Sequence, residues 1–204
     1  MKLYLALGDS ITAGYGVASP FSFPMVYANL LRRHNPDLRV INLGVNGLTT
    51  GRLLALLQAN PNIRNLVSQA SLITLTIGSN DLLRLIRNTN QSLNPSYLPL
   101  ILNNLSKNFA RIGEEIRRLN PMATVKMATL YNPLSAESAG QYFVQAQGVI
   151  DNANAIIVTW ARRYGFYVAF LDREIRGKEH LLIGSDHVHP NAAGYQVIGQ
   201  TFAR

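Results

Sequence analysis

Short apolar stretches alternate with longer amphipathic ones along the 204-residue chain. Five of the short stretches are almost continuous in apolar, β-prone residues, which is typical of strands that are buried on both faces of a sheet. They are Lys2–Leu7, Leu38–Leu43, Leu72–Ile77, Thr124–Leu130 and Phe166–Leu171. We therefore predict five buried strands.

The stretches between these strands carry apolar residues at the spacing of an amphipathic helix. Prolines mark several of their ends, as at Pro36, Pro61 and Pro121. We predict helices over Phe23–His34, Thr50–Ala59, Tyr97–Leu119, Gln141–Tyr164 and Asn191–Phe202. Because strands alternate with helices, the pattern predicts an α/β fold with a parallel sheet covered on both faces. No repeat or linker interrupts it, so we expect one domain over residues 1–204.

Polar loops that contain glycine follow four of the five predicted strands. Ligands of such sheets bind outside the carboxyl ends of the strands, so these loops are the place to look for chemistry. The first three are Gly8-Asp9-Ser10, Gly44-Val45-Asn46-Gly47 and Gly78-Ser79-Asn80-Asp81, and the segment after the last strand holds Asp186-His187-Val188-His189. The fourth strand is followed by Tyr131-Asn132-Pro133, which is less informative.

Ser10, His189 and Asp186 have the groups that ester hydrolysis by a serine requires: a nucleophile, a base and a group that orients the base. Ser10 directly follows a strand, and Gly8 allows a sharp turn there. His189 is the candidate base, and Asp186 can fix its tautomer. Each has a plain structural alternative: Ser10 as a helix N-cap, and Asp186 with His189 as a capped turn carrying a surface histidine.

Gly47 and Asn80 are the candidate donors to an oxyanion. Gly47 offers a backbone N–H at a position where a side chain would obstruct close approach, and Asn80 offers a neutral side-chain amide. Their alternatives are a Val-Asn-Gly turn and a helix-capping asparagine. Asp9 is expected to support the Ser10 turn rather than to react.

The four loops resemble, in order, four sequence blocks of the GDSL, or SGNH, hydrolases. Gly8-Asp9-Ser10-Ile11-Thr12 looks like the first block, and residues 44–50 (GVNGLTT) are similar to the second. Residues 78–81 (GSND) match the third, and residues 186–190 (DHVHP) match the fifth. The resemblance implies catalytic roles for Ser10, Asp186 and His189, and an oxyanion hole of Ser10, Gly47 and Asn80.

The same resemblance implies a flavodoxin-like three-layer α/β/α sandwich with a five-stranded parallel sheet. It also implies a serine esterase without cofactor or metal, acting on a small-molecule ester or lipid-like substrate. Members of the family cleave carboxylic esters, lysophospholipids, acyl thioesters or sugar acetates. We expect carboxylic esters with short to medium acyl groups, with carbohydrate O-acetyl ester hydrolysis as the alternative.

Two positions depart from the family pattern. Leu48 stands where many members carry an acid, so we expect a less polar mouth and an apolar acyl group. His187 stands where glycine is frequent and offers a second imidazole, although the spacing and the following proline favour His189 as the base. The acyl pocket is expected among residues 15–23, 82–97 and 131–142. Leu82, Leu83, Leu85 and Ile86 could face an acyl chain, but packing of a helix on the sheet is the stronger expectation.

The amino-acid composition excludes or disfavours several other classes of function. The absence of cysteine excludes disulfides, a thiol nucleophile and cysteine-ligated zinc. A net charge of +8 would permit nucleic-acid binding, but the basic residues are scattered, so no nucleic-acid partner is expected. A metal-dependent hydrolase that uses Asp9, Asp81, Asp186, His187 and His189 is the remaining alternative. The ordinary α/β-hydrolase motif Gly-x-Ser-x-Gly is not met, because Thr12 replaces its second glycine.

The sequence shows no signal peptide and no apolar run of the roughly 20 residues that a membrane span needs. We therefore expect a cytoplasmic protein without stable membrane insertion, or a secreted one if the chain has been trimmed.

Overall fold

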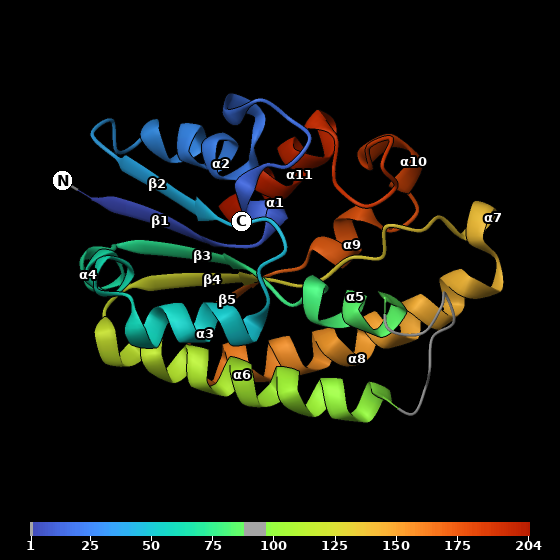
Figure 1. The fold of residues 1–204 in the computed structure, drawn as a ribbon. Helices are drawn as coiled ribbons and strands as arrows, with labels where there is room; N and C mark the ends of the chain where they lie inside the picture. The colour runs from blue at the N-terminus through green and yellow to red at the C-terminus, as the bar shows by residue number, and fades with distance from the viewer. Residues whose placement is uncertain (1, 88–96) are drawn as a thin grey trace.

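The structure, a computed structural model, describes residues 2–87 and 97–204 (Figure 1). Its centre is a five-stranded parallel sheet with strand order β2-β1-β3-β4-β5. The strands are β1 (Leu3–Gly8), β2 (Arg39–Gly44), β3 (Leu72–Thr76), β4 (Thr124–Ala128) and β5 (Tyr167–Ala169). Each predicted strand is present, and the α/β architecture with a five-stranded parallel sheet is confirmed.

Burial of the strands follows their order in the sheet. Every residue of β1 and β3 is buried, because helices cover both faces of these inner strands. The prediction that all five strands are buried is wrong for β2 and β5, which form the two edges and are partly exposed. β5 is also shorter than predicted, because Leu171 begins the helix α9.

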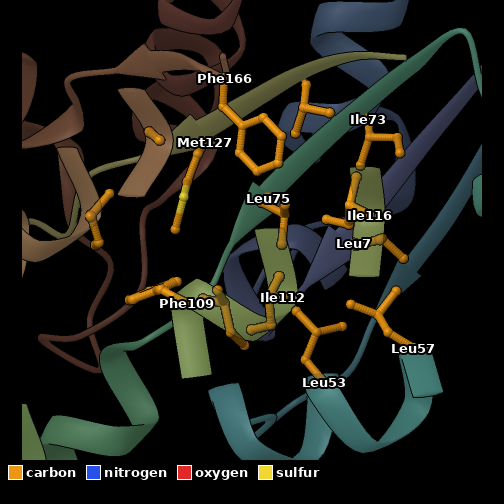
Figure 2. Packing of buried hydrophobic residues seen from close by; sticks show 14 of the residues in the cluster. Leu7, Leu53, Leu57, Ile73, Leu75, Phe109, Ile112, Ile116, Met127 and Phe166 are labelled. Atoms are coloured by element: carbon orange, nitrogen blue, oxygen red, sulfur yellow. The ribbon is translucent and has the colours of Figure 1, made fainter. Parts of the chain in front are cut away.

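Helices form a layer on each face of the sheet (Figure 1). One layer packs against the cluster shown in Figure 2, in which Leu7, Ile73 and Leu75 of the sheet contact apolar residues of α3 and α6. It contains α3 (Thr50–Ala59), α4 (Pro61–Gln69), α5 (Ser79–Arg87), α6 (Leu98–Leu119), the short α7 (Ala136–Ala139) at its margin, and α8 (Gln141–Arg163). The other layer contains α1 (Ser10–Ala13), η1 (Ser19–Phe21), α2 (Phe23–Arg32), α9 (Leu171–Ile175), α10 (Glu179–Leu182) and α11 (Ala192–Ala203).

The five predicted helices are present, and α3 has the predicted bounds. The helix α4 was not predicted, because Pro61 was interpreted only as the end of α3. In the structure, Pro61 is the first residue of α4. Asn60 caps this helix by accepting hydrogen bonds from the N–H groups of Asn62 and Ile63. An N-cap followed by proline at the first helical position is a common start signal.

The parallel strands place the loops after β1, β2 and β3 side by side at one edge of the sheet. Because β1 lies between β2 and β3, the loop after β1 is flanked by the other two. Within the described residues, no helix is long and apolar enough to cross a membrane.

Candidate active site

Ser10 begins the short helix α1 directly beyond the end of β1. The backbone turns at Gly8, whose φ of +154° disfavours any other residue and whose missing Cβ would lie 2.3 Å from the carbonyl of Thr76. Asp9, not Ser10, is the N-cap: its Oδ1 accepts a hydrogen bond of 3.0 Å from the N–H of Ile11. The N-cap interpretation of Ser10 is therefore wrong, and its hydroxyl has a different partner.

That partner is His189, 179 positions further along the chain. Nε2 of His189 lies 2.9 Å from Oγ of Ser10, and Nδ1 lies 2.6 Å from Oδ2 of Asp186. The three side chains thus form one hydrogen-bonded chain that joins the two ends of the sequence. The residues that the sequence singled out as nucleophile, base and orienting acid are within bonding distance of one another.

The turn that carries His189 is built by Asp186. Oδ1 of Asp186 accepts hydrogen bonds from the N–H groups of Val188 and His189, while Oδ2 contacts the imidazole. Asp186 therefore caps the turn, as the structural alternative predicted, and its other carboxylate oxygen also contacts the imidazole of His189. His187 occupies the tight part of this turn with a φ of 56° and is exposed.

The charge of Asp186 determines which ring nitrogen of His189 carries the proton. Partial burial opposes its ionisation, but the hydrogen bonds from His189 and Val188 together outweigh it and lower the pKa of Asp186 to about 2. An ionised carboxylate only accepts, so Nδ1 of His189 carries the proton that joins them. Nε2 is then unprotonated in the neutral ring and is oriented to accept the proton of Ser10.

Gly47 follows β2 in a turn closed by a hydrogen bond from the N–H of Leu48 to the carbonyl of Val45. Its φ of +74° favours glycine in this turn. A Cβ added to Gly47 would meet no protein atom within 4 Å, so the space over its backbone is open to an incoming ligand. Gly47 therefore lies in the Val-Asn-Gly turn, as one interpretation predicted, and its backbone is also open to close approach, as the other predicted.

Asn80 lies in the first turn of α5, directly after β3. Its Nδ2 donates a hydrogen bond of 3.0 Å to the carbonyl of Leu48, so the side chain points toward the loop after β2 rather than capping its own helix. The amide has a second N–H that this bond does not use. Gly47 and Asn80 therefore come from the two loops that flank the loop of Ser10.

Asp9 is 1% exposed beneath the Ser10 turn, and Oδ1 also accepts a hydrogen bond from the hydroxyl of Thr76. Burial raises the pKa of Asp9 to about 7, against the effect of its hydrogen bonds. These contacts fix the start of α1 to β3. They agree with the expected supporting role of Asp9.

Tyrosine contacts around His189 were not predicted from the sequence, although Tyr15 and Tyr131 begin two of the expected pocket segments. The ring of Tyr15 packs against the imidazole, and the hydroxyl of Tyr195 donates to the carbonyl of Tyr15. The hydroxyl of Tyr131 donates to the carbonyl of Val188, and burial, with the nearby Tyr195, Asp9 and Asp186, raises its pKa well above the usual value. The loop after the fourth strand, which looked uninformative, therefore supplies a contact that holds the His189 turn.

A small cavity lies beside the Ser10 turn at the carboxyl edge of the sheet. Its lining includes Ile11, Ile77, Ser79, Leu130, Tyr131 and Leu171. Ile11 follows Ser10 and Ser79 precedes Asn80, so the cavity adjoins the residues that hold the candidate nucleophile and one candidate oxyanion donor. Its lining combines these side chains with the polar residues Asp9, Thr76 and Thr129.

The expectation for Leu48 is wrong. Its side chain is 2% exposed and belongs to the hydrophobic core, so it cannot make the mouth of the site less polar. Leu82 packs into the same cluster, as expected for a helix on the sheet, whereas Leu83 is exposed. The side chains of Leu85 and Ile86, and residues 88–96 of the expected pocket segment, lie outside the described residues.

The candidate ligands of the metal-dependent alternative do not gather in one place. Across residues 2–87 and 97–204, no group of three or more His, Asp or Glu side chains could hold a metal ion. Asp186 and His189 contact each other, while Asp9 is buried under the turn and Asp81 contacts Thr50. The described part of the chain therefore does not support that alternative.

An open parallel sheet that carries a hydrogen-bonded Ser-His-Asp chain at its carboxyl edge has the groups that an acyl-transfer hydrolase requires. The model of the GDSL-like lipase/acylhydrolase family matches residues 6–197, so the chain belongs to this family. The protein is accordingly a carboxylic ester hydrolase.

Individual relatives agree with this membership. The chain is 30% identical to the spore germination lipase LipC of Bacillus licheniformis, over 97% of this chain and 92% of that protein. The solved structure of a lipase from a goat rumen metagenome has a TM-score of 0.79 and 25% identity, covering 100% of this chain and 96% of the other. The acetylxylan esterase Axe2 of Geobacillus stearothermophilus shares the fold, with a TM-score of 0.70, 19% identity and coverage of 100% and 93%.

Proposed function

We propose that the protein hydrolyses carboxylic esters through an acyl-enzyme intermediate on Ser10. The observation that carries the proposal is the hydrogen-bonded chain from Ser10 through His189 to Asp186, with distances of 2.9 and 2.6 Å. Since Asp186 holds the proton on Nδ1, the opposite nitrogen of His189 is the base nearest to the Ser10 hydroxyl. The same imidazolium can then return the proton to the leaving group.

In the first step, Oγ of Ser10 attacks the ester carbonyl while Nε2 of His189 accepts its proton. The resulting oxyanion is bound by the N–H groups of Ser10 and Gly47 and by the amide of Asn80. Collapse of this intermediate breaks the bond to the alcohol, which takes the proton from His189. Water then attacks the acyl-enzyme in the same way, releases the acid and regenerates Ser10.

The proposed substrates are esters with short to medium acyl groups. Membership of the GDSL-like lipase/acylhydrolase family, whose model matches residues 6–197, supports this substrate class. Acyl thioesters and lysophospholipids present the same carbonyl to the same groups. They extend the proposal to larger leaving groups.

Hydrolysis of carbohydrate O-acetyl esters is the second candidate. The fold that the chain shares with the acetylxylan esterase Axe2 of Geobacillus stearothermophilus supports it. A chain-length series of p-nitrophenyl esters, measured together with a per-acetylated xylose, separates the two candidates. A preference for butyrate or longer acyl groups would favour the general esterase, and activity confined to acetyl groups with rapid release from the sugar would favour the second.

Covalent trapping tests the mechanism itself. A fluorophosphonate ester should add one phosphonyl group to the wild-type protein and none to Ser10→Ala, as measured by intact mass. Ser10→Ala should also hydrolyse p-nitrophenyl acetate at the background rate, while an unchanged circular dichroism spectrum shows that it is folded. Turnover near the wild-type value in Ser10→Ala would exclude Ser10 as the nucleophile.

A further inference from the structure

Thr50 and Asp81 join the two loops that carry the candidate oxyanion donors. The N–H of Thr50 donates to Oδ2 of Asp81 at 2.9 Å, and its hydroxyl donates to Oδ1 at 2.6 Å. Thr50 lies three positions after Gly47, and Asp81 directly follows Asn80. One carboxyl group therefore receives both donors of a single residue and connects the loop after β2 to the loop after β3.

Asn108 of the long helix α6 completes this group. Its Nδ2 donates a hydrogen bond of 2.9 Å to Oγ1 of Thr50. The Thr50 hydroxyl thus accepts from Asn108 and donates to Asp81, so it joins the two side chains. Because Phe109, the next residue, is buried in the core, Asn108 is held on a helix that is itself fixed against the sheet.

The segment between Gly47 and Thr50 is held at each residue. The side chain of Leu48 is buried in the core, and its carbonyl accepts the hydrogen bond from Asn80. Thr49 is the N-cap of α3, and Thr50 is fully buried as the first residue of that helix. The contact between Thr50 and Asp81 is thus one of the connections that set the position of the Gly47 N–H relative to the Asn80 amide, together with the bond from Asn80 to Leu48.

The geometry points to Thr50 as a positioning residue that, through Asp81 and with Asn108 behind it, sets the spacing of the two oxyanion donors. This inference rests on the proposed acyl transfer. Donors stabilise an oxyanion fully only when they are held within about 0.5 Å of the geometry that places them a hydrogen-bond length, about 2.7–3.1 Å, from the developing charge. A loosened connection would let the two loops separate and would lower the turnover number, while binding of the neutral ester would change little.

Thr50→Val tests the connection, because valine keeps the shape of threonine and removes only the hydroxyl. We expect kcat for p-nitrophenyl acetate to fall about tenfold with KM within about twofold of the wild type. Thr50→Ser keeps the hydroxyl and should restore most of kcat. Asn108→Ala removes the second partner from a half-buried surface, so it should fold and should lower kcat in the same direction by a smaller factor.

A double-mutant cycle separates positioning from a merely structural effect. If Thr50 acts through the donors, Thr50→Val should cost less than about twofold in kcat when Asn80 is already alanine. Equal losses in both backgrounds, a change confined to KM, or wild-type kcat in both Thr50→Val and Asn108→Ala would overturn the inference. If Thr50→Val does not fold, the same cycle with Asn108→Ala decides.

The failure of the proposed mechanism gives a different result. In that case Ser10→Ala retains activity and is labelled by the fluorophosphonate as the wild type is. An inactive, unlabelled Ser10→Ala together with additive effects of Thr50→Val and Asn80→Ala would leave the acyl transfer intact and reject the positioning role alone.

Discussion

The ring of Tyr15 lies against the imidazole of His189, with 4.3 Å between the ring centroids and 38° between their planes. The backbone of Tyr15 is held on both sides: its N–H donates to the carbonyl of Ser10, and its carbonyl accepts from the hydroxyl of Tyr195. The aromatic face is thus fixed relative to Ser10 as well as to His189. It limits rotation of the imidazole.

Replacement of this ring should reduce catalysis. We expect Tyr15→Leu to lower kcat/KM by about three- to tenfold. An aromatic pair contributes about 0.5–1.5 kcal/mol, which corresponds to a change of this size. Tyr15→Phe keeps the ring and should stay close to the wild type, so steady-state kinetics with p-nitrophenyl butyrate compares the two. An equal loss in both variants would assign the effect to the phenol hydroxyl, and no loss in Tyr15→Leu would contradict the role of the ring.

Removal of the Asn80 amide should lower the rate of catalysis more than removal of the Tyr15 ring. Asn80→Ala removes a donor to the developing oxyanion, and losses of this kind are about 100- to 1000-fold in kcat. KM should change little, because the ester carbonyl in the ground state carries less charge. Asn152→Ala, on the exposed surface of α8, provides a matched control and should leave both constants unchanged. A loss of less than about fivefold in Asn80→Ala would remove the amide from the oxyanion hole.

Much of the fold could be predicted because the strongest patterns are local. The strands have apolar runs with few breaks, and α3 has a threonine cap at its start and a proline after its end. Local patterns do not give a strand's place in the sheet, so the exposure of β2 and β5 at the edges was not foreseen. They also left α4 unpredicted, because proline both ends one helix and begins the next.

The site shows the same division. Ser10, Asp186 and His189 were found because their neighbours in sequence form recognisable blocks, and the structure brings them together, although their catalytic roles stay predictions. Tyr15 and Tyr131 have no such block around them. Their contacts with the His189 turn join residues far apart in the chain and depend on how α1 and the loop after β4 pack. For Leu48 the sequence block gave a wrong prediction. Its position in the block suggested a side chain at the mouth of the site, but the side chain points into the core.

Gly47 and Gly177 offer a matched pair for separating strain from chemistry. Both have positive φ values, +74° and +78°, and a Cβ added at either would meet no protein atom within 4 Å. Alanine should therefore cost each position a similar free energy of unfolding, on the order of 1 kcal/mol. Only Gly47→Ala should also lose activity, because its Cβ would stand in the open space over the candidate oxyanion donor. Urea unfolding and kcat/KM measured on both variants check this, and similar activity in the two would contradict the placement of Gly47.

The buried carboxyl of Asp9 should make the stability of the protein depend on pH. Burial raises the pKa of Asp9 in the folded state to about 7, whereas in the unfolded chain it is about 4. The folded state therefore binds more protons between these values, and the contribution of Asp9 to stability is present below pH about 4 and is lost as the pH rises through about 7. Asp186 has the opposite sign, since its pKa is lowered to about 2, and its contribution is lost only as the pH falls from about 4 toward that value. Asp9→Asn keeps an oxygen for the N–H of Ile11 and the hydroxyl of Thr76 but cannot ionise.

The difference in unfolding free energy between Asp9→Asn and the wild type should therefore shift in favour of the variant as the pH is raised from 4 to 8. Urea unfolding at four pH values in this range measures that difference, and a constant difference would show that Asp9 does not titrate there.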